Sequence, residues 1–155
     1  MKKVIIADLD GTIANIDKRR SLSKKADNKM DWEKFFNPSN IKKDKPNAPV
    51  IKLLRAMSSE YEIVITSGRS DRTKDATLEW LSDNDVPYDG LYMRRDKDYK
   101  PDTLLKERML KEKVLPSHCE NDMSNIEFVL DDRDSVVQMW RKLGLTCFQV
   151  AEGNF

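Results

Sequence analysis

Apolar residues occur along the chain in two kinds of run that alternate. Short unbroken apolar runs, typical of strands buried on both faces, are followed by stretches in which apolar residues recur every three or four positions, as in amphipathic helices. The expected strands are residues 4–7, 61–66, 91–93, 126–130 and 146–150. The expected helices contain residues 50–57, 76–81, 101–114 and 134–143. This alternation predicts an α/β fold with a doubly wound, mainly parallel sheet covered by helices on both faces.

A long segment without sustained periodicity separates the first expected strand from the first expected helix. Its apolar residues gather at Trp32, Phe35 and Phe36, which predicts one short helix around residues 31–36. A segment of this length with so little regular structure is unusual unless it is functional. We therefore expect a cap-like insertion at about residues 17–49, within a single domain spanning residues 1–155, because no repeat or linker interrupts the rest.

The net charge of the chain is only +1, but it is unevenly distributed. From residue 17 to residue 45 there are ten Lys or Arg against five Asp or Glu, a net of +5, which leaves −4 for the remainder. The basic insertion is suited to a polyanionic partner. A solvated insertion whose charge has no specific role would show the same excess of Lys and Arg. No apolar run could span a membrane, and the two cysteines without a CxxC motif favour a reduced, cytoplasmic location.

Polar residues follow three of the expected strands. These polar stretches are Asp8-Leu9-Asp10-Gly11-Thr12, Ser67-Gly68-Arg69 and Asp131-Asp132-Arg133. Because the carboxyl ends of parallel strands lie at one edge of a sheet, we expect the three stretches to converge. Asp8 and Asp10 are two positions apart, so in extended chain their side chains point to the same side. Neighbouring carboxylates repel unless a cation or a shared proton stabilises them, which favours a divalent-metal phosphate site over a solvated Asp-Gly turn.

These stretches resemble the four motifs of the haloacid dehalogenase superfamily of phosphotransferases. Asp8-x-Asp10-Gly11-Thr12 is similar to the first motif, Ser67 to the second, a lysine near a helix start to the third, and Asp131-Asp132 to the fourth. The chain from residue 3 to residue 155 is more similar still to the 3′-phosphatase domain of bacteriophage polynucleotide kinase-phosphatase and its stand-alone bacterial relatives. That closer resemblance also includes Asp102-x-x-x-Lys106, Met139-Trp140-Arg141, Gln149-Val150-Ala151 and Gly153-Asn154-Phe155.

The resemblance implies a Rossmann-like haloacid dehalogenase fold and a Mg²⁺-dependent phosphomonoesterase that works through an aspartyl-phosphate. Asp8 would be the nucleophile, and Asp10 the general acid and then the general base, so Asp10 is expected to hold a proton near neutral pH. The metal would be bound by Asp8, by the carbonyl of Asp10 and by the fourth motif. Of the two carboxylates there, Asp132 is preferred as the direct ligand, with Asp131 bridging through water.

Lys106 is expected to offset charge on the phosphoryl group, with Asp102 as its partner four residues earlier, while Lys100 is the rival third-motif lysine. The residues implied in phosphate or substrate binding are Thr12, Arg19, Ser67, Gly68, Arg69, Asp102 and Arg133. For Arg133, pairing with its own acidic neighbours is equally open. Trp32, Phe35 and Phe36 could stack on a base, but packing of the insertion onto the body is favoured.

The resemblance favours a 3′-phosphate at a polynucleotide end as the substrate, with a small-molecule phosphatase for nucleoside monophosphates as the alternative. A receiver-like domain, or a nucleic-acid-binding module without turnover, is the alternative of another class. The order of the acidic motifs argues against the receiver, and the intact set of nucleophile, acid and metal ligands argues against the binding module. None of the five glycines precedes a lysine, so a phosphate-binding P-loop and 5′-kinase activity are not expected, and a separate kinase or ligase could be a partner. The oligomeric state is left open.

Overall fold

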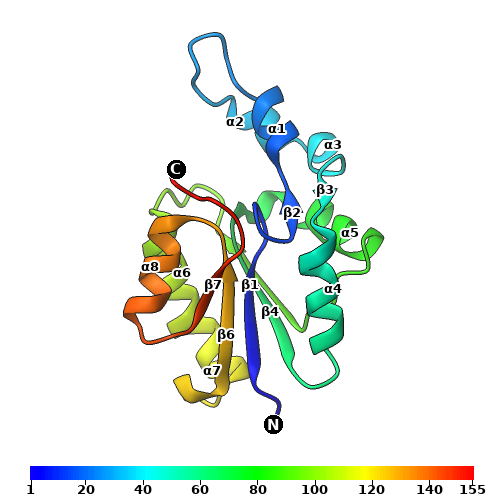
Figure 1. The fold of residues 1–155 in the computed structure, drawn as a ribbon. Helices are drawn as coiled ribbons and strands as arrows, with labels where there is room; N and C mark the ends of the chain where they lie inside the picture. Colours follow the sequence, from blue (N-terminus) through cyan, green and yellow to red (C-terminus); the bar gives the residue numbers. More distant parts are fainter.

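The computed structural model, which describes residues 1–155, contains a five-stranded parallel sheet in the order β5-β4-β1-β6-β7 (Figure 1). The strands are β1 (Val4–Asp8), β4 (Glu62–Ser70), β5 (Gly90–Arg94), β6 (Ile126–Asp131) and β7 (Cys147–Gln149). The chain adds β4 and β5 on one side of β1 and then returns to add β6 and β7 on the other. The strand order therefore reverses between β1 and β6, and the predicted doubly wound α/β fold is confirmed.

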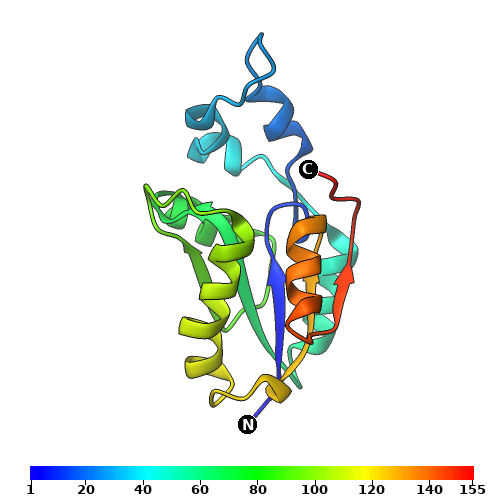
Figure 2. The ribbon, with the colours of Figure 1, turned by 90° about the vertical axis from the view of Figure 1, so that its left-hand side faces the viewer.

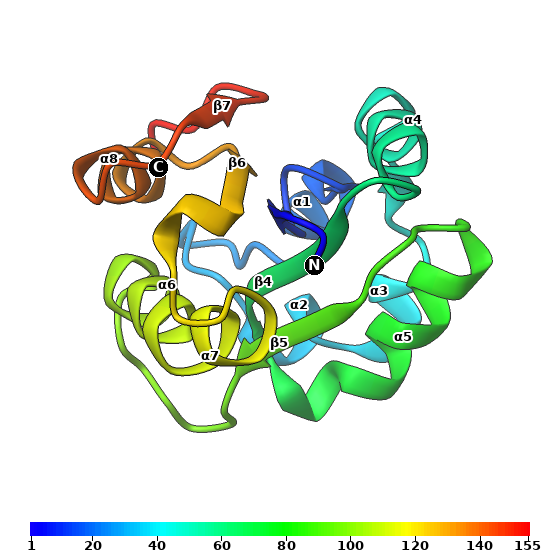
Figure 3. The ribbon, with the colours of Figure 1, turned by 90° about the horizontal axis from the view of Figure 1, so that it is seen from below.

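Helices cover both faces of the sheet, as the view from below shows (Figure 3). One face carries α4 (Ala48–Met57) and α5 (Lys74–Asp83), which the 3-10 turn η1 (Asp71–Thr73) precedes. The other face carries α6 (Asp102–Met109), α7 (Leu115–His118) and α8 (Asp134–Lys142). A further 3-10 turn, η3 (Met123–Asn125), leads into β6. No helix is both long enough and apolar enough to cross a membrane.

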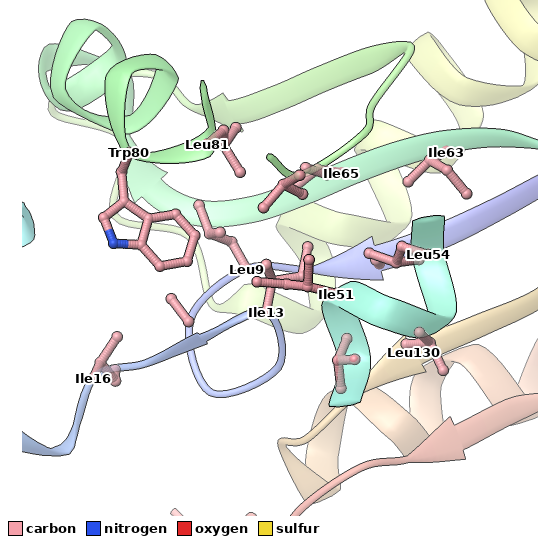
Figure 4. Close-up of a cluster of buried hydrophobic side chains, with 14 of the residues drawn as sticks. Leu9, Ile13, Ile16, Ile51, Leu54, Ile63, Ile65, Trp80, Leu81 and Leu130 are labelled. Carbon is pink, nitrogen blue, oxygen red and sulfur yellow. The ribbon is translucent and has the colours of Figure 1, made fainter. Parts of the chain in front are cut away.

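The unbroken apolar run of β1 is explained by the two cores that it joins. Ile5 and Ala7 pack in a cluster with residues of α4 and α5, part of which is drawn in Figure 4. Val4 and Ile6 point the other way, into a cluster with residues of η2 (Leu110–Val114) and α8. Because every side chain of β1 is buried, no polar position interrupts the strand before Asp8.

A wide π-helical turn, η2, separates α6 from α7. Leu105 and Met109, which precede the turn, and Leu110 and Val114, its first and last residues, are all buried. The two pairs are out of phase by one residue, which a regular α-helix could not bury on a single face. The wider turn absorbs that extra residue and keeps both pairs against the core.

The segment from β2 (Ala14–Asn15) to β3 (Lys45–Pro46), here called the cap segment, lies above the carboxyl edge of the sheet (Figures 1 and 2). Antiparallel pairing of β2 with β3 brings its two ends together. It contains α1 (Asp17–Leu22), α2 (Trp32–Phe35) and α3 (Pro38–Ile41), so the prediction of one short helix was incomplete. At the start of α8, Arg133 occupies the N-cap, and the carboxylate of Asp134 accepts a hydrogen bond from Gln149.

Candidate active site

A tight turn follows β1 and places the first motif at the sheet edge. The carbonyl of Leu9 accepts hydrogen bonds from the amides of Ile13 and Ala14, which closes the turn at 3.0 and 2.9 Å. Gly11 has φ +87°, a left-handed conformation that favours glycine. Asp8, the last residue of β1, thus lies at the switch point of the sheet, beside the end of β6.

Three carboxylates from the ends of β1 and β6 form one buried cluster with a lysine from α6. Ligand oxygens of Asp8, Asp131 and Asp132 all lie within 4.8 Å of one another. Nζ of Lys106 donates to Oδ1 of Asp8 at 2.6 Å and to Oδ2 of Asp131 at 2.9 Å. With the carboxylates ionised, one ammonium leaves the cluster with a net charge of −2.

Burial and crowding strongly affect the pKa values of this cluster. Burial, together with the negative charge of Asp131, raises the pKa of Asp8 well above its usual range, against the opposing pull of Lys106. Burial also raises the pKa of Asp132. For Lys106, burial lowers the pKa, but the charges of Asp131 and Asp8 outweigh it and raise the pKa, so the ammonium persists. The single ammonium of Lys106 therefore does not balance the three carboxylates when they are ionised.

Asp131 and Asp132 differ in how many of their oxygens are already bound. Oδ2 of Asp131 accepts from Lys106 and also from Nε1 of Trp140 at 3.2 Å, while its Oδ1 accepts the amide of Asp132 at 2.8 Å. The carboxylate of Asp132 accepts a hydrogen bond only from the hydroxyl of Thr12, at 3.4 Å. Asp132 therefore has more capacity for a further ligand.

Thr12 lies beneath this cluster and is fully buried. Its hydroxyl is 3.1 Å from Oδ2 of Asp8 and 3.4 Å from Oδ1 of Asp132, so it bridges the first and fourth motifs. In this position Thr12 orients carboxylates, and its expected contact with substrate stays a prediction.

The backbone of Gly11 passes so close to Asp132 that no side chain fits. A Cβ added at Gly11 would lie 2.1 Å from Oδ2 of Asp132. Gly144 has a similar φ of +89°, yet a Cβ there would meet nothing within 4 Å. Substitutions at the two glycines can therefore be compared: both introduce backbone strain, but only a substitution at Gly11 also displaces a site carboxylate.

We expect Gly11→Ala to reduce phosphatase activity severely, because both the positive φ and the displaced Asp132 carboxylate act at the site. Gly144→Ala should lose only about 1–2 kcal/mol of unfolding free energy, from its left-handed conformation, and should keep its activity. Thermal denaturation and turnover of both variants check this. Equal activity losses would show that strain alone is responsible.

Asp10 belongs to a second cluster, formed by arginines. Its Oδ1 accepts from Nη2 of Arg19 at 2.9 Å and from Nη2 of Arg69, whose Nε lies 3.4 Å from Oδ2. Burial raises the pKa of Asp10, but the two guanidinium groups outweigh it and lower the pKa to about 2. The expectation that Asp10 holds a proton near neutral pH is therefore wrong for this arrangement. Asp10 lies beyond the end of β1, where the alternation of side chains no longer holds.

The two arginines that hold Asp10 are buried rather than open to a ligand. Arg19, from α1, is 1% exposed and also binds Asp44, with Nε 3.1 Å from Oδ1. Arg69, from β4, is 2% exposed and donates to the hydroxyl of Thr77 at 3.0 Å. Sequence reasoning missed Asp44, whose only signal is that it is a lone acidic residue in a basic stretch. Direct phosphate binding by either arginine stays a prediction.

Asp102 does not pair with Lys106, contrary to expectation. Its Oδ1 accepts from Nη2 of Arg94 at 2.5 Å, and its Oδ2 accepts from Nη1 of Arg133 at 3.0 Å. Lys106 instead turns inward to the acidic cluster, where uncompensated charge is greater. Arg94 was missed, and its position at the end of β5 was the available signal. Arg133 thus pairs with Asp102, and not with its acidic neighbours.

The second motif lies inside β4, which continues to Ser70 instead of ending at residue 66. The hydroxyl of Ser67, fully buried, accepts the amide of Arg69 at 3.1 Å. A Cβ at Gly68 would come 2.8 Å from Oδ1 of Asp102, so this glycine lets the backbone approach that carboxylate. Lys100 lies at the rim, its ammonium 3.6 Å from Asp98 and its side chain 40% exposed.

A cleft of about 780 Å³ opens above these clusters. Asp8, Asp10, Lys106, Asp131 and Asp132 lie at its base. One wall is the cap segment, and the other is the loop between β5 and α6, which faces the cap segment in Figure 2. The cleft is larger than a phosphoryl group alone requires, so it has room for more of a substrate.

The doubly wound fold, with a buried carboxylate cluster at the carboxyl edge of its sheet, is consistent with the haloacid dehalogenase class of phosphatases. The family model described as "Polynucleotide kinase PNKP phosphatase domain" matches residues 2–155, and the chain belongs to this family. The recognition made from the sequence motifs is thereby confirmed, as is the assignment as a phosphatase, which excludes a non-catalytic module.

Solved structures similar to this chain include one described as "Structure of the Pnkp1/Rnl/Hen1 RNA repair complex", with 32% identity and a TM-score of 0.79. The match covers 100% of this chain and 44% of that one, so this chain spans less than half of the other. A second, "Structure of Pnkp1/Rnl/Hen1 complex", has 33% identity, a TM-score of 0.78 and coverages of 100% and 48%. A class C acid phosphatase from Bacillus anthracis shares the fold at 21% identity, with a TM-score of 0.62 and coverages of 92% and 62%.

Proposed function

We propose that this phosphatase removes 3′-phosphates from polynucleotide ends, with Mg²⁺ and through an aspartyl-phosphate on Asp8. The observation that carries the proposal is the position of Asp8, held by Lys106 at the base of a wide cleft beneath a basic cap segment. A narrow pocket would suit a small phosphate ester, whereas a wide cleft with a cationic wall suits the end of a polyanion. Membership of the polynucleotide phosphatase family supports the same substrate class.

Asp8 is the proposed nucleophile because its carboxylate lines the cleft and is held in place by two hydrogen-bond donors, the hydroxyl of Thr12 and the ammonium of Lys106. One of its oxygens attacks phosphorus, the bond from phosphorus to the 3′ oxygen breaks, and the phosphoryl group is transferred to Asp8. The ammonium of Lys106 lies 2.6 Å from the attacking carboxylate and offsets the negative charge of the transferring group. Water then hydrolyses the aspartyl-phosphate.

The acidic cluster fits Mg²⁺ in charge and in ligand type. Its net charge of −2 matches a divalent cation, and carboxylate oxygens are the ligands that Mg²⁺ prefers. Asp8 and Asp132 would hold the ion directly, because both oxygens of Asp131 already accept hydrogen bonds from the protein. The carbonyl of Asp10 is the proposed third protein ligand. When bound, Mg²⁺ supplies positive charge that offsets the phosphoryl oxygens.

Asp10 is the proposed general acid and base. Its ionised form, which the guanidinium groups of Arg19 and Arg69 favour, is ready to take a proton from the attacking water. Protonation of the leaving oxygen needs the acid form, which the negative charge of an arriving phosphate monoester would favour. Arg19 and Arg69 thus act mainly by positioning Asp10.

The phosphoryl oxygens would be bound by the hydroxyl of Ser67 and the amide of Gly68, inside β4. Asp102 and Arg133 fix the adjoining wall of the cleft through their ion pair. A separate kinase or ligase is a proposed partner, because the similar chains belong to complexes described as containing Rnl and Hen1. Two free, buried cysteines support a cytoplasmic setting.

Phosphate release from four substrates tests the proposed function: a 3′-phosphorylated oligonucleotide, its 5′-phosphorylated isomer, and 3′- and 5′-mononucleotides. We expect the highest kcat/KM for the 3′-phosphorylated oligonucleotide. EDTA should abolish the activity and added Mg²⁺ should restore it, because the cluster needs a cation to offset its charge. Hydrolysis of mononucleotides alone would replace this proposal with a nucleoside monophosphatase, and full activity in EDTA would exclude the metal.

A further inference from the structure

The cap segment carries an exposed indole that lines the same cleft as the acidic cluster. Trp32, the first residue of α2, is 58% exposed although it is part of an aromatic cluster. Its ring is stacked on Phe36, with centroids 5.8 Å apart and planes at 19°, and meets Phe35 edge to face at 5.5 Å. Sequence reasoning favoured packing as the role of all three rings, but of the three only Phe35 is buried. The contacts with Phe35 and Phe36 leave much of the indole of Trp32 open to a ligand.

The aromatic cluster is joined to the catalytic centre by a short chain of contacts. The centroid of the Phe35 ring lies 4.4 Å from the guanidinium carbon of Arg19. The backbone carbonyl of Phe35 accepts a hydrogen bond from Nη1 of Arg19 at 3.0 Å. Arg19 in turn binds Asp10 at 2.9 Å. The indole is therefore held at a defined place relative to the residues that act on phosphate, as a positioning surface requires.

Cationic side chains share the cleft with this ring. Arg20, Arg72 and Lys97 line it, and Arg72 and Lys97 are exposed to solvent. Aromatic faces beside a positively charged groove are the usual means of binding single-stranded nucleic acid, because each base stacks and the backbone meets the cations. A free phosphate or a short sugar phosphate would leave the indole without a partner.

We propose that Trp32 is a stacking platform for an unpaired base near the 3′ end of a single-stranded polynucleotide. The inference rests on the proposed function and deepens it, because it makes the bases next to the phosphate a determinant of substrate choice. Trp32 is a specificity-determining residue here, while the reacting groups remain Asp8, Asp10 and Lys106. Stacking contributes to binding of the polymer end and leaves the chemical step unaffected.

The test compares Trp32→Ala and Trp32→Phe on two 3′-phosphorylated oligonucleotides, one with all its bases and one with abasic 3′-terminal nucleotides. For the complete oligonucleotide, Trp32→Ala should lower kcat/KM by about 5- to 150-fold, mainly through KM, and Trp32→Phe should restore most of it. For the abasic oligonucleotide, Trp32→Ala should match the wild type. Tyr88→Ala is the matched control, since Tyr88 is an aromatic residue, 37% exposed, that does not line the cleft.

Equal losses on both oligonucleotides, or none on either, would overturn the stacking platform. A second readout is independent of turnover: quenching of tryptophan fluorescence when the Asp8→Asn protein binds the complete oligonucleotide. We expect this quenching to be largely lost when Trp32→Phe is added, and its persistence would also overturn the inference. If the wild type binds and quenches but releases no phosphate, the proposed function fails while the platform stands.

Discussion

Asp8→Asn will abolish phosphatase activity while leaving the fold intact. An amide is a poor nucleophile at phosphorus, so no covalent intermediate forms, and we expect kcat to fall by about 10³-fold or more. Asparagine has nearly the shape of aspartate and keeps an oxygen that can accept from Thr12 or Lys106, so the sheet edge should not rearrange. Steady-state phosphate release and far-ultraviolet circular dichroism measure the two parts of the expectation.

An acid-quenched reaction with a 3′-³²P-labelled oligonucleotide tests the covalent step directly. The wild type should retain label on the protein, and Asp8→Asn should retain none. Asp83→Asn, at an exposed position near the end of α5, is the control and should behave as the wild type. Normal turnover by Asp8→Asn would remove the covalent mechanism.

Lys106→Met will cost both activity and stability. Methionine leaves three buried carboxylates without an ammonium, so the net charge of the cluster becomes −3. Removal of one partner from a buried ion pair costs about 3–5 kcal/mol, and we expect a loss of that order in the free energy of unfolding without Mg²⁺. Thermal denaturation should show that Mg²⁺ restores part of the stability, while kcat stays low because the charge of the phosphoryl group is no longer offset.

Lys100→Met is the comparison that decides between the two candidate lysines. Lys100 is 40% exposed at the side chain and pairs only with Asp98, so its loss should affect stability little and kcat much less than Lys106→Met. A greater loss of kcat in Lys100→Met would assign the third motif to Lys100 and contradict the role proposed for Lys106.

The convergence of distant motifs was predictable because it depends only on strand direction. Three of the apolar runs end in polar residues, and in a parallel sheet those ends must share an edge. The structure accordingly brings Asp8, Asp131 and Asp132 within one cluster, with Lys106 against it. Such reasoning works where the backbone is regular and the side chain follows directly from the strand.

The partners of Asp10 and Asp102 were not predictable by the same reasoning. Asp10 lies in the turn that Gly11 forms, so its direction depends on the left-handed φ and not on strand alternation. The i+4 spacing of Asp102 and Lys106 allows a pair, but stronger partners exist for both in three dimensions. The helices α1 and α3 were missed because they show little apolar periodicity: ion pairs of Arg19 support α1, and the side-chain cap of Asn37 supports α3.

The contact between Arg19 and Asp10 has a consequence for engineering this enzyme. Arg19 belongs to the cap segment and Asp10 to the turn after β1, so one ion pair joins the cap segment to the carboxylate proposed as general acid and base. A chimaera in which another protein's cap replaces the cap segment would lose the guanidinium of Arg19, which holds the carboxylate of Asp10. Substrate range in this scaffold is thus altered most safely by replacing side chains that face the cleft, with the arginine left in place.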